Sequence, residues 1–290
     1  MHAHLLNIIA FEIVRRYPSE QTPRILDVGC GDARFIAYAN TRLPELIGRR
    51  AELFGVDVDD SGIQREGYFD SALERLHQAD PDVDWRTRLR QIGSNEPWPF
   101  PPDSFHVIVS NQVGEHLRDL EAFFGQGARV IRAGGFAAHV FPLEQYILEG
   151  HTGTPFAHRV LSHDLRQMYL SAFARLHLSR FGPLRRSDAE TAREFGTTRS
   201  DYVSFETWYR TWPEVATAAM AAGWRASYRY TPHLYLLKLG YKVGFDLRAI
   251  YQQPRPLVDW LLFRPLSRVS SVTVFLEWEQ TFDPHLHSWK

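Results

Sequence analysis

Apolar and polar positions in the first half of the chain alternate between the spacing of helices and the spacing of strands. Helical spacing covers residues 4–17, and a short apolar run of strand length follows at 25–28. The same reasoning predicts strands at 53–59, within 85–93, at 104–111 and at 135–143. Helices are predicted at 33–43, 61–79 and 119–131, the last closed by the turn "RAGG". Strands that alternate with helices predict a parallel sheet covered on both faces.

The pattern changes after about Leu143. Residues 161–181 predict a helix with Ser162 as N-cap, 182–202 are polar and rich in turn formers, and 204–224 return to a helical pattern. Late strands are predicted at 224–237 and 270–278, on either side of a helical piece at 239–264. The predicted fold is α/β, a Rossmann-like, mostly parallel seven-stranded sheet with helices on both faces and a helical insertion after the fifth strand. We expect three parts: the core at 1–142, the insertion at 143–222, and the completion of the sheet at 223–290.

Composition narrows the class of protein and its location. The 290 residues are 44% hydrophobic and 23% charged, with one cysteine, which excludes an internal disulfide and fits a reducing cytoplasm. We find no apolar run of about 18 residues that would span a bilayer, and Glu12 breaks the apolar stretch at the start, which argues against a signal peptide. The net charge of −1 is the sum of an acidic first half and a basic second half. The sequence has no dense block of basic residues, so we do not expect a nucleic-acid partner.

The segment "RILDVGCGDARF", residues 24–35, is the first that predicts a ligand. A buried strand runs into Gly29, Cys30 and Gly31. Glycine allows the sharp turn from strand to helix and lets a ligand lie against bare main chain. Such loops at the carboxyl ends of parallel strands form ligand crevices.

Two acids decide between the ligands that fit such a loop. Asp57 lies one βαβ unit downstream, where a carboxylate accepts hydrogen bonds from an adenosine ribose. A dinucleotide fingerprint would have a third glycine where this chain has Arg34, and Asp27 before the loop would repel a pyrophosphate. A ligand that carries an ammonium group and a sulfonium suits Asp27, so the charges favour S-adenosylmethionine.

Four segments in order resemble the class I S-adenosylmethionine-dependent methyltransferases, of the methyltransferase domain 11/23 type, over residues 20–142. "ILDVGCGDARF" resembles the first motif of that family, with Ala33 where a third glycine is frequent, and "FGVDVDDSG" resembles the second, with Asp57 at the position of the ribose-binding acid. "GSNEPWPFPPDSFHVIVSNQVGEHL" and "ARVIRAGG" resemble the third and fourth. Ser94 replaces a frequent aspartate, so Ser94 or Asn95 would contact the adenine. The cofactor-binding residues that we expect are Asp27, Gly29, Cys30, Gly31, Asp57, Val58, Ser94, Asn95, Asn111 and Gln112.

Histidines near the ends of the fourth and fifth strands are the candidates for general base. Methyl transfer from a sulfonium is an in-line displacement, and a hydroxyl acceptor must also lose its proton. His116 follows the fourth strand, and His151 and His158 lie just past the fifth. The pair Glu115–His116 is frequent in the family that the chain resembles, across different acceptors, so the alternative roles are to position the cofactor or to serve the helix N-terminus. The acids Glu144 and Glu149 show no recognisable ligand spacing, so metal binding is the less favoured alternative and we assign no metal ligands.

The acceptor is expected to bind at the insertion. Arginines are frequent in the insertion, and a guanidinium suits phosphate or carboxylate groups. The arginines considered are Arg159, Arg166, Arg175, Arg180, Arg185, Arg186, Arg193 and Arg199. We place Glu115, Arg159 and Arg166 among the acceptor-binding residues and expect O-methylation of a small molecule or glycan, sugar-containing or anionic, with S-adenosylhomocysteine as product. The alternatives are N- or C-methylation of a natural-product or quinone-like precursor, a catalytically silent cofactor-binding protein, and a nicotinamide-dependent oxidoreductase. Residues 236–271 mix apolar and basic side chains, typical of a membrane surface, a dimer contact or ordinary packing.

Overall fold

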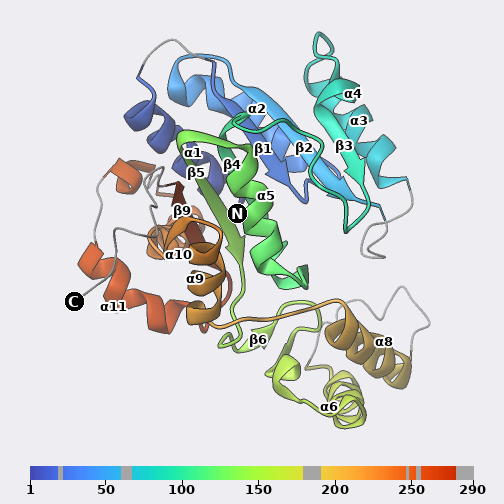
Figure 1. Cartoon of the computed structure of the whole chain (residues 1–290). Helices are drawn as coiled ribbons and strands as arrows, with labels where there is room; N and C mark the ends of the chain where they lie inside the picture. Colours follow the sequence, from blue (N-terminus) through green and yellow to red (C-terminus); the bar gives the residue numbers. More distant parts are fainter. Residues whose placement is uncertain (19–21, 60–66, 179–190, 246–247, 253–255, 279–290) are drawn as a thin grey trace.

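A single seven-stranded sheet forms the centre of the molecule, with the order β3-β2-β1-β4-β5-β9-β8 (Figure 1). The computed structural model describes residues 1–18, 22–59, 67–178, 191–245, 248–252 and 256–278. β9 is antiparallel to both of its neighbours, and every other pairing in the sheet is parallel. This confirms the predicted Rossmann-like fold. The strands are β1 (Arg24–Val28), β2 (Glu52–Val58), β3 (Leu89–Ile92), β4 (Phe105–Asn111), β5 (Ile131–Phe141), β8 (Trp224–Ser227) and β9 (Val272–Trp278).

Helices cover both faces of the sheet because successive strand residues point to opposite sides. On β4, Val107 and Val109 belong to the core under one set of helices, while Ile108 belongs to the core on the other face. The first set is α1 (His2–Arg16), α2 (Arg34–Ile47), α3 (Tyr68–Ala79) and α10 (Thr231–Val243). The second set is α5 (Leu120–Val130), α9 (Trp212–Ala221) and α11 (Pro256–Leu266). The short helix α4 (Trp85–Arg88) leads into β3.

Three boundaries differ from the sequence-based predictions. The segment "RAGG" does not close a helix: α5 ends at Val130, and β5 starts at Ile131 and runs through these residues. A register shift between Phe105 and Val107 absorbs them, as a β-bulge does. The predicted strand at 224–237 is only four residues long, because Tyr230 has a left-handed backbone and α10 begins at Thr231, with Pro232 in its first turn. The polar stretch 182–202, expected to be turns, contains most of α8 (Ala192–Phe205), which a capping box starts at Thr191.

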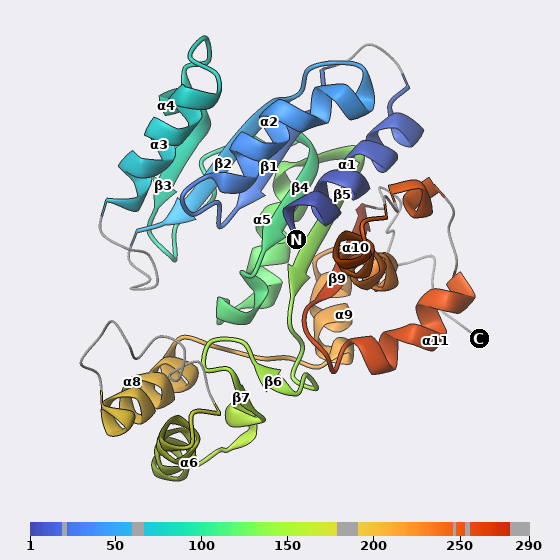
Figure 2. The same cartoon turned by 180° about the vertical axis from the view of Figure 1, so that it is seen from behind.

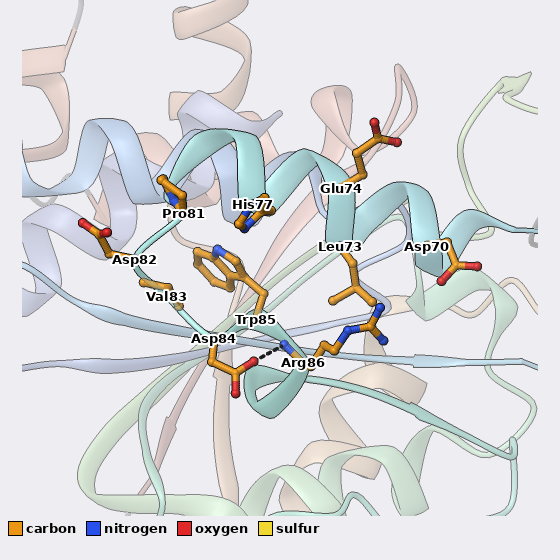
Figure 3. A pocket seen from close by; sticks show the side chains of 10 residues that line it. All are labelled: Asp70, Leu73, Glu74, His77, Pro81, Asp82, Val83, Asp84, Trp85 and Arg86. Atoms are coloured by element: carbon orange, nitrogen blue, oxygen red, sulfur yellow. Dashed lines mark hydrogen bonds between the residues drawn. The ribbon is translucent and has the colours of Figure 1, made fainter.

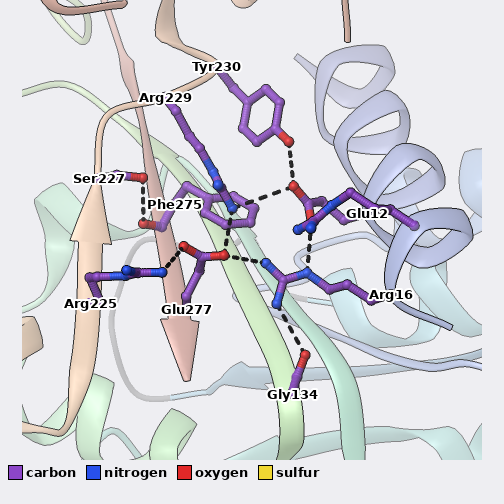
Figure 4. Close-up of polar contacts among 10 residues, drawn as sticks. Glu12, Arg16, Gly134, Arg225, Ser227, Arg229, Tyr230, Phe275 and Glu277 are labelled. Carbon is purple, nitrogen blue, oxygen red and sulfur yellow. Dashed lines mark hydrogen bonds and ion pairs between the residues drawn. The ribbon is translucent and has the colours of Figure 1, made fainter. Parts of the chain in front are cut away.

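A buried ion network joins the first helix to the last two strands (Figure 4). Glu12 on α1 is 1% exposed and accepts hydrogen bonds from Tyr230 Oη at 2.5 Å and Arg16 Nε at 2.7 Å. Arg16 and Arg229 both pair with Glu277 on β9, at 2.5 and 3.0 Å. Each buried charge has an opposite partner, which offsets the cost of its desolvation. The network fixes the N-terminal helix against the antiparallel edge of the sheet.

The insertion after β5 lies beyond the carboxyl ends of the central strands, toward which the arrows of β4 and β5 point in both views (Figures 1 and 2). It contains a two-stranded sheet, a short helical turn and two helices that pack on each other: β6 (Leu148–Glu149), β7 (Thr154–Pro155), η2 (Ala157–Arg159), α6 (His163–Arg175) and α8. Ser162 caps α6, as predicted. Among the described residues, the helices are too short or too polar to cross a membrane.

Candidate active site

The loop from β1 into α2 has the backbone that the glycines predicted. Gly29 and Gly31 have φ of +71° and +51°, and Ala33, at the third glycine position of the motif, has φ of +58°. A Cβ on Gly29 would lie 2.3 Å from Val113 Cγ2, so only glycine fits where this loop meets the segment after β4. The Gly29 amide donates to Val56 O at 2.8 Å, which ties the loop to β2. The loop is therefore a rigid turn at the carboxyl edge of the sheet.

Two buried carboxylates flank this loop. Asp27 on β1 and Asp57 on β2 are each 4% exposed. Asp57 accepts hydrogen bonds from the Gly31 amide and, at 2.8 Å, from the Val58 amide. Burial, and then the charge of Asp57, raise the pKa of Asp27 well above its usual value. A ligand that brings positive charge to this edge would stabilise the ionised form of Asp27.

The other predicted cofactor residues lie around the same edge and differ in how free their side chains are to contact a ligand. Cys30 is buried, and its Sγ would contact a Cβ on Gly55, so it fills space beside β2. Ser94 and Asn95 are exposed in the turn after β3, and the Asn111 side-chain oxygen is buried without a hydrogen-bond partner at the end of β4. The Gln112 side chain instead donates to Val140 O at 3.1 Å and Ser271 Oγ at 2.9 Å, so it is held between β5 and the start of β9.

A second polar cluster forms where the insertion meets the end of the sheet, around the carboxylate of Glu149. Glu149 is fully buried and accepts hydrogen bonds from Tyr146 Oη, Tyr209 Oη and His151 Nδ1 at 3.0, 2.7 and 2.8 Å. The amides of His151 and Thr152 donate to it as well, at 3.1 and 2.6 Å. Burial alone would raise the pKa of Glu149, but these donors, His151 first, hold that pKa far below its usual range. Glu149 is therefore an anion that fixes the ring of His151.

His116 and Glu115 approach this cluster from the short helical turn η1 (Gly114–His116) after β4. The rings of His116 and His151 are in edge contact, with centroids 5.2 Å apart. His116 Nδ1 lies 2.6 Å from Glu206 O, and because a carbonyl only accepts, this nitrogen carries the proton. Glu115 is 1% exposed, and burial raises its pKa to about 8. The structure thus brings together two of the three predicted histidines and Glu115.

The remaining predicted residues belong to the walls of this region. His158 stacks on Tyr146 and donates through Nε2 to Glu144 O at 2.8 Å. The Tyr146 ring therefore stands between His158 and the Glu149 carboxylate that His151 contacts. Arg159 is exposed and donates to the same carbonyl. Arg166 does not face the cluster with a free guanidinium: it is 6% exposed and donates to the carbonyls of Ala157, Val160 and Ser200 and to Ser204 Oγ. Arg166 is a structural residue of the insertion, and Arg180, Arg185 and Arg186 lie outside the described residues.

Sequence reasoning missed the residues that organise the cluster. Glu149 was dismissed for lack of ligand spacing, although it lies two residues before His151, where a carboxylate can reach the imidazole. Tyr146 and Tyr209 carried no signal in the sequence, because nothing in the local pattern distinguishes them from aromatic residues of the core. In the structure both hydroxyl groups donate to Glu149.

A surface hollow of about 620 Å³ lies elsewhere, between α3 and the segment around α4 (Figure 3). Leu73, His77 and Trp85 are among its lining residues. None of the predicted site residues lines it, and it lies on the outer edge of the sheet beside β3. The carboxyl edge, with its glycine loop, remains the candidate site.

Strand order, glycine loop and acid at the tip of β2 together define a class I S-adenosylmethionine-dependent methyltransferase domain. Comparison with known families agrees, because residues 26–137 match a family described as "Methyltransferase domain". The match covers less than half of the chain.

Two curated relatives each match a little over a third of the chain. The human mitochondrial ubiquinone biosynthesis O-methyltransferase is 31% identical over 114 residues, which is 39% of this chain and 27% of that protein. The ubiquinone biosynthesis O-methyltransferase of Bradyrhizobium sp. (strain ORS 278) is 30% identical over 115 residues, which is 39% of this chain and 37% of that protein. The match therefore spans only about a third of these relatives. A solved S-adenosylmethionine-dependent methyltransferase from Mesorhizobium loti is 13% identical, with a TM-score of 0.48, over 91% of this chain and 95% of that one.

Proposed function

We propose that the chain binds S-adenosylmethionine at the glycine loop and transfers its methyl group to an oxygen atom of an acceptor held under the insertion. The observation that carries the proposal is the pair of sites at one edge of the sheet. The loop at Gly29 and Gly31 with Asp57 suits the adenosyl part of the donor. The cluster of Glu115, His116 and His151 lies past β4 and β5, where the acceptor would meet the methyl group.

The chemistry is a displacement in which the acceptor oxygen forms a bond to the methyl carbon as the carbon–sulfur bond breaks. The sulfonium becomes the neutral thioether of S-adenosylhomocysteine, and the acceptor hydroxyl must give up its proton. The Nδ1 contacts of His116 and His151 support a role of the cluster in this step, because a neutral imidazole with Nδ1–H engaged keeps the Nε2 lone pair. An oxygen acceptor needs such groups more than a carbon nucleophile activated in advance does.

Two further observations narrow the acceptor. Both curated relatives are named as O-methyltransferases of ubiquinone biosynthesis, which supports oxygen as the methylated atom. The match to them covers only 39% of this chain, so a phenol-like ring and a sugar hydroxyl both stay in the proposal. Arg166 itself gives no support to an anionic acceptor, because its guanidinium donates to groups inside the insertion.

The proposal is tested in two steps. Calorimetry should show that S-adenosylhomocysteine binds and that NADH does not, because the site is proposed to be specific for the adenosyl group of the methyl donor. The same ligand should stabilise the folded protein by mass action. Transfer of labelled methyl from S-adenosylmethionine is then measured on a panel of catechols, phenols and sugar nucleotides. Binding of S-adenosylhomocysteine without transfer to any oxygen acceptor would reject the proposal and leave N- or C-methylation or a silent cofactor-binding protein.

A further inference from the structure

Three potential metal ligands converge at the end of β4. One ligand atom of each of Glu115, His116 and His151 lies within 4.8 Å of the ligand atoms of the other two. Glu115 and His116 come from η1, and His151 comes from the tight turn between β6 and β7, 35 residues along the chain. Side chains that are distant in sequence therefore meet in a small volume with two imidazoles and one carboxylate.

Each imidazole is held in the way that metal-binding histidines are held. Metal-ligating histidines commonly donate their other ring N–H to a carboxylate or a backbone carbonyl, which fixes the tautomer and the ring orientation. His151 Nδ1 lies 2.8 Å from the buried carboxylate of Glu149, and His116 Nδ1 lies 2.6 Å from Glu206 O. Both rings therefore keep Nε2 with its lone pair for a ligand.

The carboxylate of Glu115 supplies the independent evidence. Its side chain is 1% exposed, and both of its oxygens lack a hydrogen-bond partner in the structure. A buried carboxylate without donors is costly, and a bound cation is one of the few groups that offset the cost. Among the described residues, no lysine or arginine forms an ion pair with Glu115 or with its neighbour Glu149. The site thus combines a buried carboxyl group that has no hydrogen-bond partner with two oriented imidazoles.

From these contacts we infer that Glu115, His116 and His151 bind a divalent transition-metal cation of the zinc type. Two histidines and a glutamate form a ligand set that Zn²⁺ uses in catalytic sites, with one position left open. The glutamate at 149 and the carbonyl of Glu206 act behind the two imidazoles and position them.

This metal deepens the proposed function and, in its catalytic role, depends on it. An acceptor hydroxyl in the open position would lose its proton to solvent more readily, because the cation stabilises the oxygen anion. That oxygen then forms the bond to the methyl carbon while the carbon–sulfur bond breaks. The cation is neither oxidised nor reduced, so no further reactant is needed.

The test measures binding of the metal alone, apart from any methyl transfer. Chelator-treated full-length protein is titrated with ZnCl₂ and with CoCl₂ by calorimetry, next to the variants Glu115→Gln, His151→Asn and Glu149→Gln. We expect one site per chain in the unmodified protein, loss of that site in the first two variants, and affinity lower by about 10- to 100-fold in Glu149→Gln. His77→Asn is the matched control, because His77 is exposed on α3 at the outer edge of the sheet; this variant should bind as the unmodified protein does.

A second measurement avoids dependence on how the variants fold. X-ray absorption of the zinc-loaded, unmodified protein should show two imidazoles and oxygen at about 2.0–2.1 Å. A sulfur ligand, a single imidazole, or binding that survives both Glu115→Gln and His151→Asn in folded protein would overturn the inference. Affinity for S-adenosylhomocysteine, measured on the same samples, separates the two proposals. Methyl transfer by metal-free protein would reject the catalytic role of the metal and keep the enzyme. Metal binding without affinity for S-adenosylhomocysteine would keep the metal site and reject the proposed function.

Discussion

Replacement of Glu149 by glutamine tests whether this buried anion organises the site. Four donors point at Oε1, from Tyr146, Tyr209 and the His151 amide and ring, and the Thr152 amide points at Oε2. If the glutamine oxygen keeps the first four, its amide nitrogen faces the Thr152 N–H, donor against donor. An unsatisfied buried donor costs about 1–3 kcal/mol, and hydrogen bonds to a neutral acceptor are weaker than those to a charged one by about 1 kcal/mol each.

These effects are not additive, and we expect a total loss of about 3–5 kcal/mol in the free energy of unfolding. For a chain of this size the midpoint of thermal unfolding should fall by about 6 °C or more. The effect should depend on pH. The pKa of Glu149 is lower in the folded protein than the reference value of 4.5, so its stabilisation is complete above that pH and is lost as the pH falls below it.

Thermal unfolding followed by circular dichroism at pH 7 and at pH 4 measures both effects. Glu144→Gln is the matched control, because Glu144 lies in the same segment but is exposed; it should change the free energy of unfolding by less than about 0.5 kcal/mol. A midpoint for Glu149→Gln within 1–2 °C of the unmodified protein at pH 7 would refute the reasoning, since about 3 kcal/mol corresponds to a larger shift.

Three other changes test the loop, the cofactor acid and a buried carboxyl group. Gly29→Ala should destabilise the chain by about 2 kcal/mol or more, because it adds a clash with Val113 to the strain of positive φ; urea unfolding beside Gly48→Ala, which has the same φ of +71° and open space around it, isolates the clash. Asp57→Asn should weaken binding of S-adenosylhomocysteine by about tenfold or more, through loss of a charged acceptor, and calorimetry that finds equal affinities would contradict the ribose assignment. Burial raises the pKa of Asp259 to about 6, so the folded protein loses stability as pH rises from about 4 to 6. Asp259→Asn should accordingly raise the unfolding midpoint more at pH 8 than at pH 4, and an equal change at both would show that this carboxyl titrates normally.

Short-range patterns were enough to predict the cofactor side of this protein. The strand at 24–28, the glycines after it and the acid at Asp57 are each separated by a few residues or one helix, and the connection between parallel strands is tightly constrained. A strand-to-helix turn that needs positive φ favours glycine, so the position of the turn at Gly29 and Gly31 could be predicted from the sequence. The alternation of strands and helices predicts a mostly parallel sheet, which is why the fold was predicted in its main features.

Only the tertiary structure decided the acceptor side. Whether Arg166 faces a ligand or the backbone around it depends on how α6 packs against α8, and the arginine count in the sequence carried no information about that. The start of α10 lies in a run of aromatic residues, whose intrinsic propensity favours a strand. Tertiary packing overrode that propensity, so the sequence pattern did not predict the helix start. Above all, Glu115, His151 and Tyr209 meet because β4, the turn after β6 and the segment after α8 end at one place in space. No local period encodes such a meeting, since it is set by the burial of three separate segments against the same edge of the sheet.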